Sequence, residues 1–206
     1  MGRRIRRIGA LKLQKKRGYA RVSPPGDPAP QASFPAENMR LHMELQVMGV
    51  QETTVRAGSS RVATYTLRIT SERAPEFIDI TGLVRESVKR SGLRDGIVVV
   101  FSRHTTAAVK INENEPLLIQ DMEDFLERVS PRHGAYRHND FSVRTVNMTE
   151  DECPNGHAHC QHLTLSTSES VPLVDGDIQL GRWQSIFMVE LDYGRPREVL
   201  VQIMGC

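Results

Sequence analysis

The sequence predicts an α+β domain in which sandwich-like, mostly antiparallel β-structure dominates and two helices accompany it. Apolar and polar residues alternate along residues 62–69, as in a half-buried strand. Two later segments repeat apolar residues at helical spacing, and the C-terminal part divides into short apolar runs between turn residues. Many short strands with few helices favour antiparallel pairing within one domain.

A basic, proline-rich segment precedes this domain. Residues 1–26 hold nine of the 27 basic residues and no acidic one, which leaves 18 basic against 25 acidic residues for the rest. Four prolines in residues 23–30 exclude helix and central strand there. We expect a disordered extension over residues 1–40 and the folded domain over 41–206. A targeting segment, a basic arm for RNA or membrane, and a start site placed too early are the alternatives.

The domain is expected to open with two antiparallel strands and a helix. Residues 43–47 and 62–69 alternate, and residues 56–60 would join them. Thr81 is the expected N-cap of the helix that follows, and residues 91–92 (Ser-Gly) are its expected C-cap. The apolar stripe of this helix consists of Leu83, Val84 and Val88.

The middle of the chain predicts a central strand and a second helix. Residues 97–101 are continuously apolar, and residues 109–111 are expected to continue into the partner strand. The helix should begin near Asn114 with Pro116 in its first turn, where the missing amide does no harm, and end before Pro131. We interpret its apolar stripe as core; the stripe consists of Leu118, Met122, Phe125 and Val129.

A long polar stretch and a series of strands complete the domain. Residues 134–156 are interpreted as a loop that is either floppy or part of a site. Residues 175–177 and 194–196 have the composition of hairpin-type turns. The expected strands are residues 163–165, 171–174, 178–180, 185–191 and 198–204.

The composition excludes several classes of protein. No apolar run is long enough to span a membrane. Three cysteines give no disulfide framework, so we expect a reducing compartment and a cytoplasmic location. The acidic balance of the folded part argues against a nucleic-acid-binding surface there. Nucleic-acid binding stays an alternative only for the basic extension. No phosphate-cradling glycine loop, nucleophile elbow or Cys-x-x-Cys motif is present.

Residues 104–115 are a candidate site segment. They place the imidazole of His104, two hydroxyls, the carboxamides of Asn112 and Asn114 and two carboxylates directly after an apolar strand. Polar groups at the end of a strand are well placed to meet a ligand. A polar turn followed by a helix cap is the alternative.

Residues 153–162 contain the densest group of cysteine and histidine, which are the usual zinc ligands. Their spacing does not suit a structural zinc knuckle. If residues 157–163 form a strand, His157 and His159 face one way and Cys160 and His162 the other. One face then supplies at most two ligands, so an open, histidine-based metal site is favoured over a closed one. The roles of Cys153, His157, Cys160 and His162 stay open.

Two residues near the C-terminus are candidates for different reasons. Trp183, the single tryptophan, begins a strand, and such a residue packs in a core more often than it stacks on a ligand. Glu190 interrupts an apolar run. A carboxylate in such a run is costly unless it is paired, hydrogen-bonded or metal-bound, so Glu190 is either a site residue or an exposed residue of an edge strand.

Three groups of residues, in this order along the chain, carry a resemblance. They are His104-Thr105-Thr106-Ala107-Ala108 with Ile111-Asn112-Glu113-Asn114, then Tyr136-x-His138 with Asn155-x-x-Ala158-His159, and Leu180-Gly181-x-Trp183-Gln184-x-Ile186 with Glu190. Together they resemble the YjbQ family, described as secondary thiamine-phosphate synthase proteins. The resemblance covers residues 43–205. Arg182 departs from it, because a threonine is common before this tryptophan.

The resemblance implies a mostly antiparallel domain that assembles as a homotrimer. It implies a pocket that gathers His104, His138, His159 and Glu190, either as a divalent metal site (zinc or magnesium) with an open position or as an acid–base set that binds a phosphorylated metabolite. The activity it implies is weak thiamine-phosphate synthesis, a transferase reaction. A non-catalytic trimer that binds a metal or metabolite is the alternative. The expected ligand-binding residues are Thr105, Asn112, Asn114, Asn155, Trp183 and Gln184.

Overall fold

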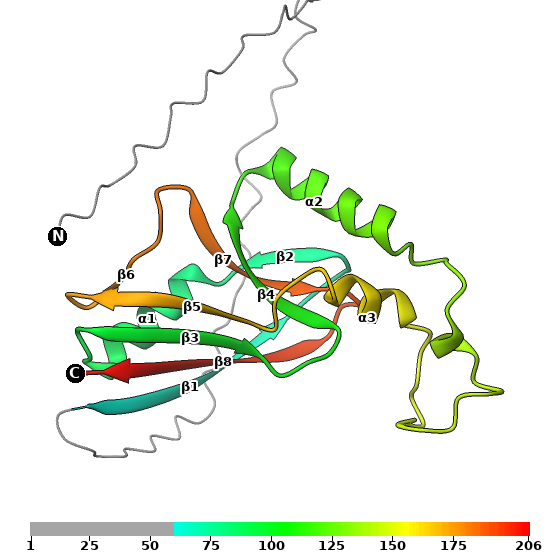
Figure 1. The fold of residues 1–206 in the computed structure, drawn as a ribbon, viewed down its shortest axis with the longest axis horizontal. Coiled ribbons are helices and arrows are strands. Elements are labelled where there is room, and N and C mark those ends of the chain that lie inside the picture. The colour runs from blue at the N-terminus through cyan, green and yellow to red at the C-terminus, as the bar shows by residue number, and fades with distance from the viewer. Residues whose placement is uncertain (1–59) are drawn as a thin grey trace, which may run out of the picture. The chain divides into compact units, whose positions relative to one another are not determined.

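Two antiparallel sheets and three helices make up the fold in a computed structural model, which describes residues 60–206 (Figure 1). The larger sheet has the order β1-β8-β3-β5-β6 and the smaller one β2-β7-β4. The strands are β1 (Arg61–Thr70), β2 (Glu76–Asp79), β3 (Gly96–Ser102), β4 (Ala107–Glu113), β5 (Ser168–Val174), β6 (Asp177–Ile178), β7 (Gln184–Glu190) and β8 (Pro196–Gly205). The helices are α1 (Thr81–Ser91), α2 (Pro116–Val129) and α3 (Gly156–His162), with a 3₁₀ turn η1 (Arg137–Asn139).

This arrangement confirms the mostly antiparallel α+β domain that the sequence predicts. The expected extension over residues 1–40 and the expected strand at residues 43–47 lie outside the described residues. No helix within residues 60–206 is long and apolar enough to cross a membrane.

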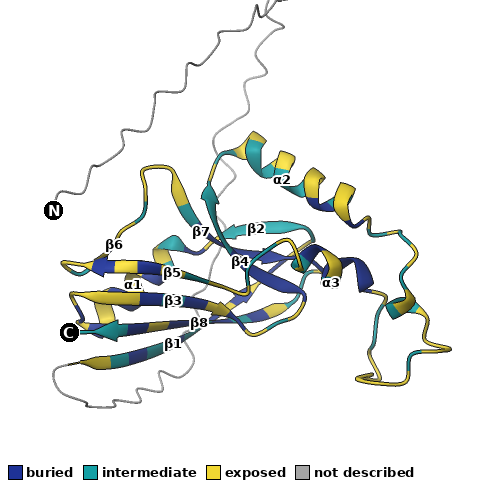
Figure 2. Cartoon of the chain, viewed as in Figure 1, coloured by how far each residue is buried: buried dark blue, intermediate teal, exposed yellow. Residues whose placement is uncertain are grey.

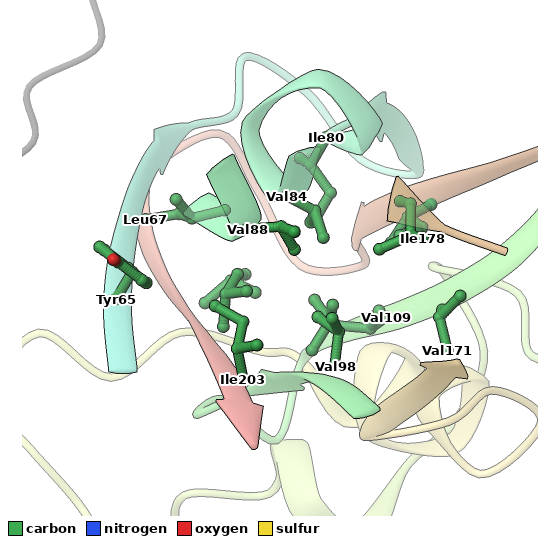
Figure 3. Close-up of a cluster of buried hydrophobic side chains, with 14 of the residues drawn as sticks. Tyr65, Leu67, Ile80, Val84, Val88, Val98, Val109, Val171, Ile178 and Ile203 are labelled. Carbon is green, nitrogen blue, oxygen red and sulfur yellow. The ribbon is translucent and has the colours of Figure 1, made fainter. Parts of the chain in front are cut away.

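The main core lies between one face of the larger sheet and a layer formed by α1 and the smaller sheet. Every second residue of β1 points into it, from Ala63 to Ile69, as the alternation predicts. Val84 and Val88 of α1 pack over Ile203 and its neighbours on the sheet (Figure 3). Burial of these branched side chains is the main favourable contribution to folding.

A second, smaller core lies on the other face of the smaller sheet. Phe187 and Val189 of β7 point into it, whereas Ile186 and Met188 point into the main core. Leu126 of α2 and Ala158 of α3 close it from outside. Because β7 is buried on both faces, its sequence is continuously apolar instead of alternating.

Two expected pairings are wrong. β4 (residues 107–113) pairs with β7 in the smaller sheet and not with the central strand β3, which lies between β8 and β5. Residues 194–196 are no hairpin, because they lead from β7 in one sheet to β8 in the other. Local patterns predict strands but not their partners. The turn at residues 175–177 does form a hairpin, with Asp175 and Gly176 at positive φ.

The helix starts differ from expectation by one residue each. Ile80, not Thr81, is the N-cap of α1, and the Thr81 hydroxyl instead accepts the Ile186 N–H at 2.8 Å. Glu115, not Asn114, caps α2, because its carboxylate accepts the N–H groups of Leu117 and Leu118. The expected C-cap is confirmed, since Gly92 adopts a left-handed conformation with φ of 66°.

The apolar residues of α2 that we expected to lie in the core are in part exposed. Phe125 and Val129 are 49% and 47% exposed, while Leu126 is 2% exposed and packs with Ile119 on the smaller sheet. The helix therefore rests on a line of residues next to the expected one. Figure 2 shows α2 as mainly exposed and intermediate along its length.

Residues 156–162 form helix α3, and residue 163 is its C-cap. The strand expected over residues 163–165 is therefore wrong, and so is the assignment of the histidines to two faces of a strand. The carboxamide oxygen of Asn139 accepts the Gly156 N–H at 2.8 Å at the start of α3. A side chain at Gly156 would collide with Tyr136, whose Cβ lies 2.6 Å from the position of an added Cβ. These tertiary contacts fix the helix start. The strand β2 was not expected.

Replacement of Gly205 by alanine should destabilise the protein by roughly 2 kcal/mol or more, because an added Cβ would overlap the backbone carbonyl of Asp95. Gly82→Ala is the matched control. Nothing lies within 4 Å of its added Cβ, and it should leave stability unchanged or raise it by about 0.5 kcal/mol. Urea unfolding of both variants measures the difference, and equal midpoints would contradict the close approach of Gly205 to the Asp95 carbonyl.

Candidate functional site

A pocket of about 850 Å³ opens where the β3–β4 turn, the long loop, α3 and the β7–β8 turn meet. His104 comes from the first of these segments, His138 from the loop and His159 from the helix. Thr105 and Asn155 line the same pocket. Side chains that lie far apart in sequence thus converge on one concave surface, as in most small-molecule sites.

His138 and His159 lie directly against each other. Their ring centroids are 4.7 Å apart, and the rings meet edge to face at 68°. The contact arises because Tyr136, two residues before His138, packs on Gly156 at the start of α3. Burial, followed by the proximity of His138, lowers the pKa of His159. The Nε2 atom of His138 is buried without a hydrogen-bond partner among the described residues.

His104 is held in one orientation by the backbone. Its ring Nε2 accepts the backbone N–H of Glu198 at 2.8 Å, and the backbone N–H of His104 donates to the Ser102 hydroxyl at 3.3 Å. Burial, with Arg197 nearby, lowers the pKa of His104 and favours the neutral ring. An Nε2 that accepts a hydrogen bond carries no proton, so the ring proton lies on Nδ1.

Five arginines line the pocket, and none of them belongs to a motif that predicted a site. Four of them are each paired with a carboxylate, and Arg137 makes no ion pair within residues 60–206. Together they offer many N–H donors, and such donors suit an oxyanion more than a neutral ligand. Because most of them are paired, they add little net charge. The pairs are Arg103 with Glu198, Arg144 with Glu152, Arg195 with Asp192 and Arg197 with Glu190.

The Arg144–Glu152 pair closes the long loop on itself. Its nitrogen and oxygen lie 2.9 Å apart, and the hydrogen bond from Arg144 lowers the pKa of the Glu152 carboxyl. Arg144 also donates to the carbonyl of Asn147 at 2.8 Å. The described loop is therefore folded, and residues 143–153 of it line one side of the pocket. Its expected role in a site stays a prediction.

Glu190 lies beneath the pocket and does not line it. Its side chain is fully buried and bonded to Arg197 through two N–H groups, one at 2.6 Å. The hydroxyl of Ser71 donates to it at 3.0 Å. The buried carboxylate is thus paired, as the interrupted apolar run requires, and the alternative of an exposed edge-strand glutamate is wrong.

Asn155 is also tied to the floor of the pocket. Its amide nitrogen donates to the Asp192 carboxylate at 3.1 Å, and its carboxamide oxygen is buried without a partner among residues 60–206. Thr105 is exposed at the edge of the pocket. Orphaned polar atoms of Asn155 and His138 on one pocket wall are positions that a bound molecule or water would satisfy.

Four expected ligand-binding residues lie elsewhere. The β4–β7 register pairs Ala107 with Glu190 at the pocket end and Glu113 with Gln184 at the opposite end. Asn112 and Asn114 are at that opposite end, where Asn114 donates to Asp79 at 2.8 Å. The Gln184 carboxamide oxygen accepts the Gly181 N–H at 2.7 Å. Within one chain these groups support turns and caps.

Trp183 does not pack in the core. The residue is 62% exposed, and the guanidinium of Arg182 lies 4.5 Å from its ring centre. The stacked pair stands at the same end of the molecule as Gln184, away from the three histidines. The expectation of a core tryptophan is therefore wrong, since a residue at a strand end is not obliged to point inward.

The donor set does not fit a metal site made of three histidines. No three His, Cys, Asp or Glu side chains within residues 60–206 are grouped to hold a metal ion. His104 already uses its Nε2, and burial raises the pKa of the Cys153 thiol, which opposes the thiolate form that zinc requires. His138 and His159 remain as a facing pair with one free, buried nitrogen.

A neighbouring groove of about 650 Å³ shares part of this wall. His104, Thr105 and His159 line both hollows. On its other side lie Phe101 and Leu163, both exposed and apolar. The two hollows together offer a polar, arginine-rich compartment beside an apolar one.

The chain is similar to proteins of one family throughout this region. A family model described as UPF0047 protein YjbQ-like matches residues 65–206. A UPF0047 protein of Methanothermobacter thermautotrophicus is 40% identical over 144 residues, which cover 70% of this chain and 93% of that protein.

Two solved structures have the same fold. A YbjQ-like protein of unknown function from Sulfolobus solfataricus P2 gives a TM-score of 0.64 at 30% identity and covers 71% of this chain and 99% of its own. A hypothetical protein from Aeropyrum pernix K1 gives 0.62 at 34% identity, with coverage of 69% and 98%. By sequence and by fold, the chain belongs to the YjbQ-like UPF0047 family.

Proposed function

We propose that this protein is a small-molecule transferase with weak thiamine-phosphate synthase activity. It would join hydroxymethylpyrimidine diphosphate to thiazole phosphate with loss of pyrophosphate. The observation that carries this proposal is the convergence of three histidines and five arginines on one pocket. Guanidinium groups recognise phosphate oxygens by paired N–H donors.

For this reaction, the pocket must bind the diphosphate group as it leaves. The bond between the methylene carbon of the pyrimidine and the diphosphate oxygen breaks, and a bond from that carbon to the thiazole nitrogen forms. No net proton transfer is required, so the main task is to stabilise charge that develops on the departing diphosphate. Oriented N–H donors in a partly buried site do this well, and the arginines supply them.

The apolar groove supports substrates that combine phosphate with an organic ring. His104 and His159 separate it from the arginine-rich pocket. A ring could lie against Phe101 and Leu163 while its phosphate reaches the arginines. The volume of about 850 Å³ for the larger hollow is in the range of small-molecule sites.

Cytoplasmic location is part of the same proposal. Cys153, Cys160 and Cys206 are all free, which agrees with a reducing compartment.

Replacement of Arg195 or His159 by alanine should lower the rate of thiamine phosphate formation by about 10²-fold or more, because each removes a donor from the pocket wall. Product formation from the two phosphorylated substrates measures this. His133→Ala, at an exposed position outside the pocket lining, is the control and should retain the wild-type rate. Stabilisation of the wild-type protein by either substrate without turnover would support the binding protein instead.

A divalent metal is proposed only for the facing pair His138 and His159. A zinc ion held there would be lost from His138→Ala and His159→Ala but retained by His104→Ala, because His104 Nε2 is occupied by Glu198. Elemental analysis of the purified variants tests this. Loss of zinc from all three variants would favour a three-histidine site instead. Wild-type protein that contains no metal would overturn the metal proposal.

A homotrimer is the proposed assembly. The stripe of α2 that includes Phe125 and Val129 is apolar and half-exposed, which favours contact with another protein surface. The ligand contacts expected of Asn112, Asn114, Trp183 and Gln184 would then have to come from a neighbouring copy, since they lie far from the pocket within one chain.

Light scattering during gel filtration should give three times the chain mass for the wild type. Phe125→Glu should lower the mass, because a charge at an apolar interface is costly to bury. Gln120→Glu adds the same charge at an exposed polar position of α2 and should leave the trimer intact. A monomeric wild type contradicts the assembly proposal.

A further inference from the structure

We propose that Arg197, Thr106 and His104 form an oxyanion subsite of the pocket, and that the buried Glu190 is the positioning residue that orients it. The ligand class is a phosphate or diphosphate group. The inference rests on the proposed function, namely that the pocket binds a phosphorylated molecule. It assigns the site's oxyanion contacts to three residues and gives Glu190 an indirect role.

Glu190 has no acceptor capacity left for a ligand. Its Oε1 accepts the N–H groups of Leu191 and Asp192 at 3.1 and 3.0 Å, and its Oε2 accepts the Ser71 hydroxyl at 3.0 Å. Both oxygens also accept from Arg197. With 0% of its surface exposed, the carboxylate acts only through the groups that it holds.

Arg197 is the group that Glu190 holds. Its Nε and Nη2 donate to the two carboxylate oxygens, which fixes the plane of the guanidinium. Nη2 also donates to the Thr106 hydroxyl oxygen at 3.0 Å. Nη1 has no partner among the described residues, and Arg197 lines the pocket while only 4% exposed. Two N–H donors are therefore oriented and unused.

Thr106 and His104 complete the set of donors. The Thr106 oxygen accepts from Arg197 and, at 3.4 Å, from Arg195, so its hydroxyl hydrogen is directed elsewhere. His104 accepts from Glu198 at Nε2, which leaves Nδ1–H as its donor. The buried Nε of Arg195 also lacks a partner within residues 60–206. A group of donors without acceptors matches the oxygens of a phosphate.

The arginines of the subsite are each balanced by a carboxylate, so a test can tell whether Glu190 orients Arg197 or only neutralises its charge. Glu190 balances Arg197, and Asp192 balances Arg195. If Glu190 only neutralised charge, its removal would leave a net positive pocket and tighten anion binding. If it orients Arg197, removal of its charge weakens binding despite the added positive charge. The two roles predict effects of opposite sign.

Calorimetric titration with inorganic diphosphate tests the inference. Glu190→Gln should bind at least tenfold more weakly than the wild type. Asp175→Asn removes the same charge from an exposed hairpin and should not change the affinity. Thr106→Val should also lose about tenfold, and Thr106→Ser should rescue binding because it keeps the hydroxyl. In an Arg197→Gln background, Glu190→Gln should have no further effect.

The outcomes separate this inference from the proposed function. A wild type that does not bind diphosphate overturns the proposed phosphorylated ligand. If the wild type binds diphosphate, two results would overturn the positioning role alone. One is unchanged or tighter binding by Glu190→Gln, and the other is fully additive losses of affinity in the double variant. Thermal melting verifies the fold of each variant. If Glu190→Gln does not fold, the Thr106 pair decides, and equal affinity of Thr106→Val and wild type overturns the subsite.

Discussion

The ion pair between Glu190 and Arg197 is the constraint on which the arrangement of the two sheets depends. It joins the end of β7 in the smaller sheet to the start of β8 in the larger one. Ser71, which follows β1, and Thr106, which precedes β4, bond to the same pair. Two buried charges are costly to desolvate and are tolerated only when each finds its partners. Chain segments from both sheets must therefore meet at this end of the sandwich before the charges can be buried.

Local pattern was sufficient for elements whose partners lie nearby in sequence or whose faces are clearly divided. The alternation in β1 and the Gly92 cap follow from short-range chemistry. Long-range contacts decided the rest. The helix at residues 156–162 begins where Tyr136 packs on Gly156, and the pairing of β4 with β7 depends on a sheet that no single segment encodes. For α2, the buried line through Leu126 and the exposed line through Phe125 are both apolar, so periodicity could not choose between them.

The candidate site was predictable in part for similar reasons. His104, His138 and His159 come from motifs that carry the family resemblance, and one pocket brings them together. The arginines were missed because surface arginines are common in any sequence. The sequence did contain one signal for Arg197. Residues two apart in a strand face the same side, so Arg197 is expected on the inward face with Val199 and Val201. Two charges of opposite sign at inward positions, here Glu190 and Arg197, indicate a buried pair.

The division of the pocket between a rigid part and a loop has an evolutionary consequence. His104, Thr106 and Arg197 stand on or beside strands whose packing the whole fold maintains. The opposite wall, residues 143–153, belongs to a loop closed by its own Arg144–Glu152 pair. Insertions or deletions in that loop can reshape the pocket without a change in either sheet. Descendants of one ancestral scaffold can therefore acquire pockets of different shape while they keep the same floor of strand-borne residues.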